Sequence, residues 1–188
     1  MQLPRLTLLV LSFLSAPVAL AACPTAADMV NGVEVMTDYG NVEVHRRAGN
    51  DRVQVEVTFE GGTEGSLLDF LHGIYLMSAI PMENGKALTG EAQNFGEMSD
   101  AIAWQAPAPN AQWVTEGLGA ASITAGEPET FQIGSCSLAA YEVKLDYEGE
   151  DYQEVYMVLQ DLGIGLMTQS TLDTDVENTS YVSIKAVE

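Results

Sequence analysis

The chain has 188 residues, a length that allows one ordinary domain with its own core and leaves little room for a second. It carries 27 acidic and seven basic residues, and the net charge of −20 excludes a plain nucleic-acid binder, which needs a basic surface. The same charge argues against polar docking on an anionic membrane surface. Because 47% of the residues are hydrophobic, the chain is also too apolar to be an acidic disordered tail.

The first 21 residues have the layout of a bacterial secretory signal peptide. Arg5 is their only charge, and the short apolar run of residues 6–14 follows it. A transmembrane helix would need about 20 consecutive apolar residues, and prolines interrupt this shorter stretch. We therefore expect residues 1–21 to be the signal and residues 22–188 to be a single β-rich domain of a periplasmic or otherwise exported protein.

Two processing patterns overlap at Cys23. Ala19-Leu20-Ala21 fits the A-x-A cleavage signal, which would release a chain that begins at Ala22. The sequence Leu20-Ala21-Ala22-Cys23 also resembles the lipobox of bacterial lipoproteins, in which the cysteine is acylated and anchors the protein in the envelope. The alternative use of Cys23 is a disulfide with Cys136, the only other cysteine. Both uses stay open, and the pairing argument slightly favours the disulfide.

Alternation of apolar and polar residues predicts antiparallel strands over most of the remaining chain. Residues 42–46 and 52–59 alternate, and turn-forming residues separate them at 38–41, 48–51 and 60–62, which predicts three neighbouring strands joined by hairpins. Further strands are predicted in the C-terminal third, with a polar loop between the last two of them. Their ranges are 141–147, 152–159, 164–170 and 181–187, and the loop is 173–178.

Two stretches are harder to assign. Residues 66–69 could be a capping box that opens a helix, but residues 68–76 alternate as a strand does, and Gly73 weakens a helix, so we predict one long bent strand. The prolines of 106–110 predict a loop between Trp104 and Trp113. The fold class expected from the whole pattern is mainly β, an antiparallel meander that forms a curved sheet, a half-barrel or a barrel.

The hairpin centred on Leu159-Gln160-Asp161-Leu162-Gly163-Ile164-Gly165-Leu166 resembles a segment of uncharacterised exported bacterial envelope proteins. Those proteins have a curved half-barrel like that of the periplasmic lipoprotein carriers. The likeness covers about the last third of the chain, and Asp161 stands where members of the group often have proline. The resemblance implies a fold and a compartment and brings no catalytic residue with it.

A search for catalytic patterns returns no nucleophile motif, no glycine-rich phosphate loop and no zinc-ligand spacing. We place His45, which precedes two arginines, on the solvated face of its strand, and we interpret His72 as a hydrogen-bonded core histidine. The acidic turns at 146–151 and 173–178 could offer oxygen ligands to calcium, but we interpret them as solvated, and no metal or cofactor is predicted. A carboxylate pair that acts as acid and base depends on spatial position and cannot be assigned from spacing.

The apolar face of the predicted sheet is the remaining candidate site. No long amphipathic helix is predicted to cover it, so the sheet must close on itself or leave a concave apolar surface. The same residues would otherwise form an ordinary core. If the concave surface is open, lipid or apolar peptide is its natural guest. The candidate lining residues are Val55, Val57, Phe59, Phe70, Trp104, Trp113, Tyr141, Val143 and Leu145.

The sequence therefore favours an exported, non-enzymatic envelope protein that acts by binding or scaffolding, with an apolar ligand or an envelope protein as partner. The alternative is a periplasmic hydrolase that uses a pair of carboxylates. Removal of the signal would leave six basic residues, so the mature chain would have a net charge of 6 − 27 = −21. That charge is expected on the wet side of the sheet and in its turns, where it favours solubility.

Overall fold

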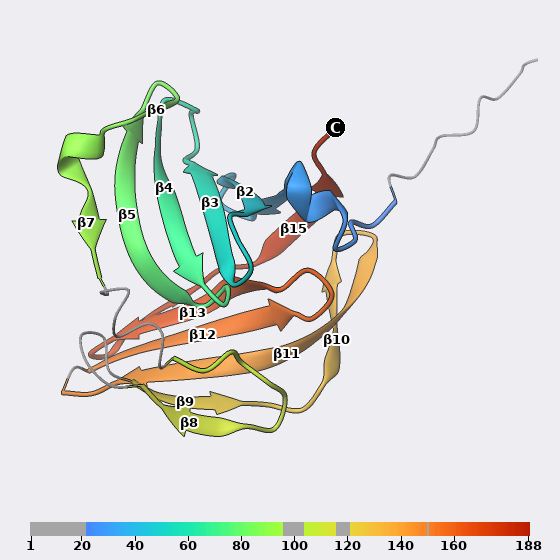
Figure 1. Cartoon of the computed structure of the whole chain (residues 1–188), viewed down its shortest axis with the longest axis vertical. Helices are drawn as coiled ribbons and strands as arrows, with labels where there is room; N and C mark the ends of the chain where they lie inside the picture. Colours follow the sequence, from blue (N-terminus) through green and yellow to red (C-terminus); the bar gives the residue numbers. More distant parts are fainter. Residues whose placement is uncertain (1–21, 96–103, 116–120, 150) are drawn as a thin grey trace, which may run out of the picture.

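The computed structural model describes residues 22–95, 104–115, 121–149 and 151–188. Within these ranges the chain forms two antiparallel β-sheets and two short 3-10 turns, η1 (Asp28–Val30) and η2 (Thr89–Glu91). The mainly β, antiparallel fold that the sequence predicts is confirmed. Both sheets are visibly curved, but each has two free ends, so the described strands do not close into a barrel (Figure 1).

The first sheet contains most of the N-terminal half of the chain and is completed by the last strand. Its meander runs from β1 to β5, and the C-terminal β15 pairs with the free edge of β1. In spatial order its strands are β15 (Tyr181–Ala186), β1 (Val33–Thr37), β2 (Val42–Arg47), β3 (Arg52–Thr58), β4 (Glu64–Leu71), β5 (Tyr75–Glu83) and β6 (Lys86–Ala87), and β7 (Gln93–Asn94) also pairs with β5.

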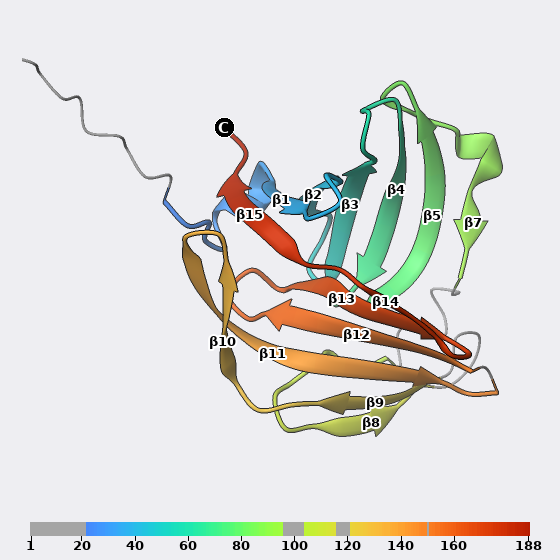
Figure 2. The same ribbon diagram turned by 180° about the vertical axis from the view of Figure 1, so that it is seen from behind.

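The second sheet contains the remaining strands, and its strands run at a steep angle to those of the first sheet (Figures 1 and 2). In spatial order they are β14 (Asp175–Asn178), β13 (Ile164–Leu172), β12 (Tyr152–Leu159), β11 (Cys136–Tyr147), β9 (Ala121–Ala125) and β8 (Gln112–Val114), while β10 (Glu129–Ile133) pairs with the first part of β11.

The central strand of the second sheet, β12, is covered on both faces. Every residue from Glu154 to Leu159 is buried, although successive side chains of a strand point to opposite faces. Met157 and Leu159 belong to one apolar cluster, with the valines of β1 and β3, whereas Tyr156 and Val158 belong to a second cluster. A strand of this kind has no solvated side.

The end of the β4–β5 hairpin lies directly against β13. The amide of Gly165 donates a hydrogen bond to the carbonyl of Gly73, with 3.1 Å between nitrogen and oxygen. A Cβ atom on Gly165 would lie 2.6 Å from that carbonyl oxygen and 2.8 Å from Cγ2 of Ile74. Only glycine at residue 165 permits this approach, which joins the two sheets through their backbones.

The burial of β12 includes one carboxylate, that of Glu154, which is 8% exposed. Three tyrosine hydroxyls donate hydrogen bonds to it, from Tyr147 at 2.7 Å, Tyr152 at 2.8 Å and Tyr156 at 3.1 Å. Because a buried carboxylate is costly without hydrogen-bond donors, these hydroxyls are what makes the position tolerable. The rings of Tyr147 and Tyr152 also stack, with centroids 5.3 Å apart.

Two boundary predictions are wrong. The single bent strand expected over 68–76 is a hairpin, because His72 and Gly73 take positive φ angles of 52° and 77° and reverse the chain. The loop expected over 173–178 contains β14, which pairs with β13. This pairing is made by backbone hydrogen bonds, so the polar side chains of the segment gave no sign of it. The loop predicted between Trp104 and Trp113 is confirmed for residues 104–111.

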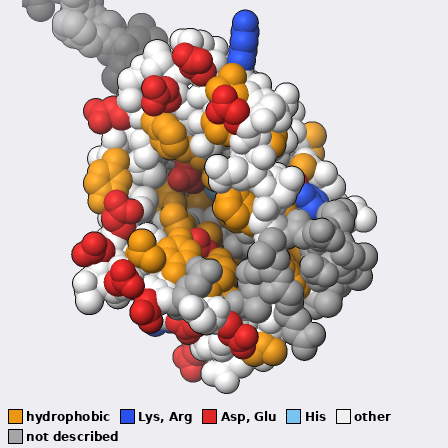
Figure 3. Space-filling model, turned by 90° about the vertical axis from the view of Figure 1, so that its left-hand side faces the viewer, with side chains coloured by type: hydrophobic (Ala, Val, Ile, Leu, Met, Phe, Trp, Pro, Cys, Tyr) orange, Lys and Arg blue, Asp and Glu red, His pale blue; other side chains and the backbone are white. Residues whose placement is uncertain are grey.

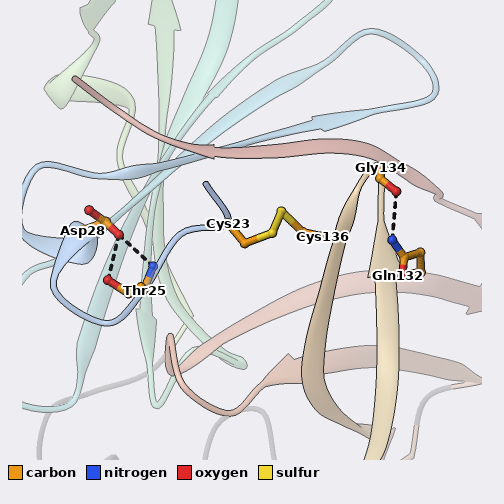
Figure 4. The surroundings of a disulfide bond; sticks show 6 residues. All are labelled: Cys23, Thr25, Asp28, Gln132, Gly134 and Cys136. Carbon is orange, nitrogen blue, oxygen red and sulfur yellow. Dashed lines mark hydrogen bonds between the residues drawn. A yellow bond between two sulfur atoms is a disulfide. The ribbon is translucent and has the colours of Figure 1, made fainter. Parts of the chain in front are cut away.

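Cys23 and Cys136 form a disulfide, with their Cα atoms 5.5 Å apart (Figure 4). The bond connects the segment before the first sheet to the β10–β11 hairpin of the second. Beside it, the backbone amide and the hydroxyl of Thr25 donate hydrogen bonds to Asp28 at 2.7 and 2.8 Å, which fixes the turn that leads into β1. The bond uses the Sγ atom that acylation would require, so lipidation of Cys23 and this disulfide are mutually exclusive.

The predicted signal, residues 1–21, lies outside the described residues. Among the helical segments that are described, none has the length and apolar character needed to cross a lipid bilayer.

We expect loss of the disulfide to lower the free energy of unfolding by about 4 kcal/mol, since a closed loop of this length restricts the unfolded chain strongly in the entropic model. The loop spans a sequence separation of 113 residues. Urea unfolding of the C23S/C136S double variant, compared with the oxidised mature chain, measures the difference. An unchanged midpoint and slope would contradict the expected contribution.

Candidate functional site between the two sheets

A cavity of about 180 Å³ lies between the two sheets, and we call it the inter-sheet cavity. Its walls come from β1–β4 and β15 of the first sheet and from β12 and β13 of the second. The lining residues are Thr37, Tyr39, Asn41, Glu43, His45, Val55, Val57, Leu68, Phe70, Tyr156, Gly165, Met167, Thr179 and Tyr181.

The inner wall of this cavity is apolar and its outer part is polar. Val55 and Val57 are buried, and Leu68 and Phe70 are half-buried beside them on the neighbouring strand. Tyr39, which is 57% exposed, marks the solvent side of the lining. Figure 3, a view of the left-hand side of Figure 1, shows a hollow walled mostly by hydrophobic side chains with acidic side chains in and around it.

Two ionisable side chains from β2 line this cavity together. Glu43 and His45 are alternate residues, so both point to the same face of the first sheet. The distance between His45 Nε2 and Glu43 Oε2 is 3.0 Å. The side chain of His45 is 3% exposed and that of Glu43 is 18% exposed. The second ring nitrogen, Nδ1 of His45, is buried and has no hydrogen-bond partner within the described part of the chain.

The prediction that His45 lies on a solvated face is therefore wrong. The alternation of β2 was interpreted correctly, but the face that carries Val42 and Val44 is the outer one. That outer face is partly covered by the chain that follows η1: a Cβ on Gly32 would lie 3.0 Å from Cγ1 of Val44. Arg46 also donates to the carbonyl of Asn31 at 3.2 Å. The outer face of β2 is thus covered at Val44, and Glu43 and His45 point inward.

Two tyrosines complete the polar part of the cavity. The hydroxyl of Tyr181 donates a hydrogen bond to the carbonyl of Met167 at 3.1 Å, and this bond links β15 to β13. Burial raises the pKa of Tyr181 above its usual range, and the nearby charge of Glu43 adds to this shift. Burial likewise raises the pKa of Tyr156, whose hydroxyl also lies beside the Glu154 carboxylate. Both phenols therefore stay neutral at ordinary pH.

A second cavity, of about 360 Å³, lies where the β2–β3 turn meets the loop around residue 107; we call it the Arg47 cavity. Arg47 and Arg52 line it, two of the few basic residues of the chain. Their charge is largely balanced, because Arg52 Nε donates to Asp69 at 3.0 Å and Asp51 is also in the lining. The Arg47 cavity therefore combines charges of both signs with apolar side chains such as Val53, Val158 and Leu162, and it is not a dedicated anion site.

Three of the aromatic residues predicted to bind an apolar ligand lie at the second apolar cluster. Trp104 and Tyr141 belong to it and Trp113 packs against it, and Tyr141 also lines the Arg47 cavity. Trp104 is 6% exposed, and its ring lies 5.0 Å from that of Tyr75. The indole nitrogen of Trp113 donates to the Tyr75 hydroxyl at 2.7 Å. Tyr141 donates to the carbonyl of Pro107 at 2.9 Å. The Tyr141 hydroxyl thus holds the proline loop onto the second sheet, and the Tyr75 hydroxyl, which donates to the carbonyl of Gln105 at 2.9 Å, holds it onto the first.

The other two predicted aromatic residues lie in different surroundings. Phe59 ends up 42% exposed beyond the end of β3, whereas Phe70 lines the inter-sheet cavity. Sequence reasoning also chose Val55 and Val57 correctly as facing a concave surface. It missed Glu43 and His45, although their spacing of two residues on a strand was a usable signal. Tyr181 and Met167 were unpredictable because the pairing of distant strands brings them in.

The remaining sequence candidates lie elsewhere. His72 is half-buried in the β4–β5 turn rather than on a strand face, and its Nε2 lies 3.2 Å from the carbonyl oxygen of Trp104. Asp146, Asp151 and Asp173 line a third depression on the surface. In the described ranges, no three His, Cys, Asp or Glu side chains converge in a way that could hold a metal ion.

Comparison with known proteins finds no matching family model, no matching characterised protein and no matching solved structure.

Alkaline titration should separate the buried tyrosines from the rest. Burial raises the pKa of Tyr75 to about 12 and also raises those of Tyr141, Tyr156 and Tyr181. Unfolded tyrosines ionise near pH 10, so the free energy of unfolding should fall as the pH rises from about 10 to 12. Tyrosinate absorbance followed together with circular dichroism should show these four ionising at higher pH than the exposed tyrosines.

The control is the same titration in concentrated urea, where all tyrosines should ionise in one step near pH 10. A single step in the folded protein, with the circular dichroism unchanged, would contradict the burial described above.

Proposed function

We propose that the mature chain is an exported, non-enzymatic envelope protein that binds a small apolar group between its two sheets. The observation that carries this proposal is the inter-sheet cavity, in which apolar side chains from both sheets face one another. Small-molecule sites in proteins are typically concave and mostly apolar, with a few polar groups that orient the ligand. Here Glu43, His45 and Tyr181 are those polar groups.

The size of the cavity limits the guest. At about 180 Å³ it is close to the engineered apolar cavities of about 150 Å³ that hold benzene. Sites for larger ligands usually measure about 300–1,000 Å³. The guest that we propose is therefore a short apolar molecule, or the end of a longer one, rather than a whole lipid.

The location that we propose follows from the sequence and agrees with the disulfide. Disulfides persist in oxidising compartments, and residues 1–21 have the layout of an export signal. A net charge of −20, spread over turns and outer strand positions, favours solubility in the envelope space. The resemblance of the β12–β13 hairpin to exported envelope proteins supports the same location.

The rival proposal, a hydrolase that uses two carboxylates, needs both of them on one concave surface. In the part of the chain that is described, the inter-sheet cavity contains one carboxylate, Glu43, and the Arg47 cavity contains one, Asp51. Three carboxylates, those of Asp146, Asp151 and Asp173, line the third depression together. All three residues are exposed, so none has the burial that makes a carboxyl a general acid at neutral pH. No specific observation favours this rival over binding.

Toluene is a suitable minimal probe for the apolar cavity, because it has no polar group. Titration of the isotope-labelled mature chain should give saturable chemical-shift changes at Val55, Val57 and Met167, which line the cavity. The Leu68→Phe variant should weaken this binding at least tenfold, because the larger ring fills the space that the guest needs.

Val114→Phe is the matched control, since Val114 is 64% exposed on β8 and lies outside the lining. Thermal unfolding of each variant verifies that it is folded. Shift changes that are absent in the wild type, or equal in the Leu68→Phe and control variants, would refute binding in this cavity.

Export makes a separate prediction, about mass. The protein recovered from the periplasm of a bacterial host should begin at Ala22 and should lack two hydrogens because of the disulfide. Intact mass spectrometry before and after reduction measures both features. A diacylglyceryl group on Cys23, or an uncleaved first segment, would overturn this processing.

A further inference from the structure

We propose that the inter-sheet cavity selects a guest that carries a hydroxyl group, which donates a hydrogen bond to Nδ1 of His45. The ligand class is a small neutral molecule with an apolar body about the size of a benzene ring, such as a phenol or a short alcohol. This inference rests on the proposed function, because it requires that the cavity binds an apolar guest. It adds which atom of the protein recognises that guest and what chemistry the guest must have.

Nδ1 of His45 is the atom that calls for a partner. His45 is only 2% exposed, and Nδ1 has no hydrogen-bond partner among the described residues. Buried polar atoms in proteins are nearly always satisfied, and an exception calls for a specific explanation. His45 is part of the cavity lining, so a guest in the cavity is positioned to satisfy its ring.

The position of the ring proton decides which partner Nδ1 can take. Nε2 of His45 lies 3.0 Å from Oε2 of Glu43, and an ionised carboxylate has no hydrogen to donate. The hydrogen of this contact is therefore on Nε2. A neutral imidazole with its hydrogen on Nε2 has a lone pair on Nδ1, and that atom accepts. Glu43 is thus a positioning residue that turns the free nitrogen into an acceptor, which matches a donor on the guest.

The surroundings of that acceptor limit the charge of the guest. Val55 pairs with His45 across β2 and β3, and Leu68 pairs with Val55 across β3 and β4, so an apolar surface adjoins the histidine on one face of the first sheet. An anionic guest would face the Glu43 carboxylate and the acidic surface of the whole chain. A cationic guest would lose its hydration against these apolar walls. A neutral hydroxyl avoids both costs and still supplies the donor.

Three probes of similar size separate the alternatives. Phenol has a hydroxyl donor, anisole has an oxygen that only accepts, and toluene has no polar group. Calorimetric titration of the oxidised mature chain should give phenol an affinity about tenfold above that of both other probes, the gain expected when a buried acceptor is satisfied.

Two variants at one position test the role of Nδ1. His45→Phe keeps a ring but removes the acceptor. The affinity for phenol should therefore fall to that for toluene, while the affinity for toluene should stay the same or rise slightly. His45→Asn keeps a side-chain acceptor bonded to Cγ, at the place in the side chain that Nδ1 occupies, and should recover part of the preference for phenol. Recovery by asparagine is an effect that a purely structural role for the ring would not produce.

Nitrogen chemical shifts give a readout that does not depend on binding. The chain has two histidines, and the His72→Gln variant assigns the remaining set of signals to His45. The free protein should show a hydrogen on Nε2 and a free lone pair on Nδ1, and phenol should shift Nδ1 alone. A hydrogen on Nδ1 would overturn the inference.

The possible outcomes distinguish this inference from the function on which it rests. If phenol, anisole and toluene bind equally, the cavity is apolar only, so the inference fails and the proposed function stands. If anisole binds as tightly as phenol, the histidine donates rather than accepts, and the inference fails. If no probe binds, a water molecule alone satisfies Nδ1, and both proposals fail.

Discussion

The structure depends on the burial of β12 on both faces. A strand in an antiparallel sheet commonly has one solvated face, but here the residues from Glu154 to Leu159 are covered on both sides. One face contributes to the cluster that contains the first-sheet valines, and the other contributes to the cluster beneath the proline loop. The two sheets and the loop are therefore organised around a single strand, and Tyr156 of that strand forms a wall of the inter-sheet cavity.

This constraint also explains the polar interior. Because Glu154 cannot reach bulk water, three tyrosine hydroxyls supply the hydrogen bonds that the carboxylate would otherwise receive from solvent. The same logic applies to the carbonyls of the proline loop, which accept from His72, Tyr75 and Tyr141. The single buried side-chain atom without such a partner, among the described residues, is Nδ1 of His45. His45 lines the inter-sheet cavity, so a guest in this cavity can donate the hydrogen bond that protein groups supply to the other buried polar atoms.

Periodicity in the sequence predicted most strands because the side-chain period of a strand is a local property. It predicted the fold class and several boundaries within one or two residues, such as those of β2, β3 and β12. It could not tell which face of a strand is the inner one when both faces are partly apolar. At β2 the chain after η1 contacts Val44 and Arg46 on one face, and Glu43 and His45 on the opposite face line the cavity.

The aromatic residues illustrate a second limit. Trp104, Trp113 and Tyr141 are large and apolar, which made them natural choices for a ligand surface. However, Trp113 donates to the Tyr75 hydroxyl and Tyr141 donates to the carbonyl of Pro107 in the loop between the two tryptophans, and a pattern of hydrophobicity does not contain that information. Tyr181 was unpredictable for another reason, because its place in the site depends on the pairing of β15 with β1.

That pairing has a consequence for how the chain folds. Val33 of β1 lies opposite Ala186 of β15, so the two partners are separated by nearly the whole domain. The hairpins β1–β2 and β2–β3 can form locally, but the free edge of β1 must wait for the last strand. Contacts of such long sequence separation pay a large loop-closure entropy before they stabilise anything, and they slow folding. We therefore expect the docking of the final strand to be a late step in folding, and this step also brings Tyr181 to the inter-sheet cavity.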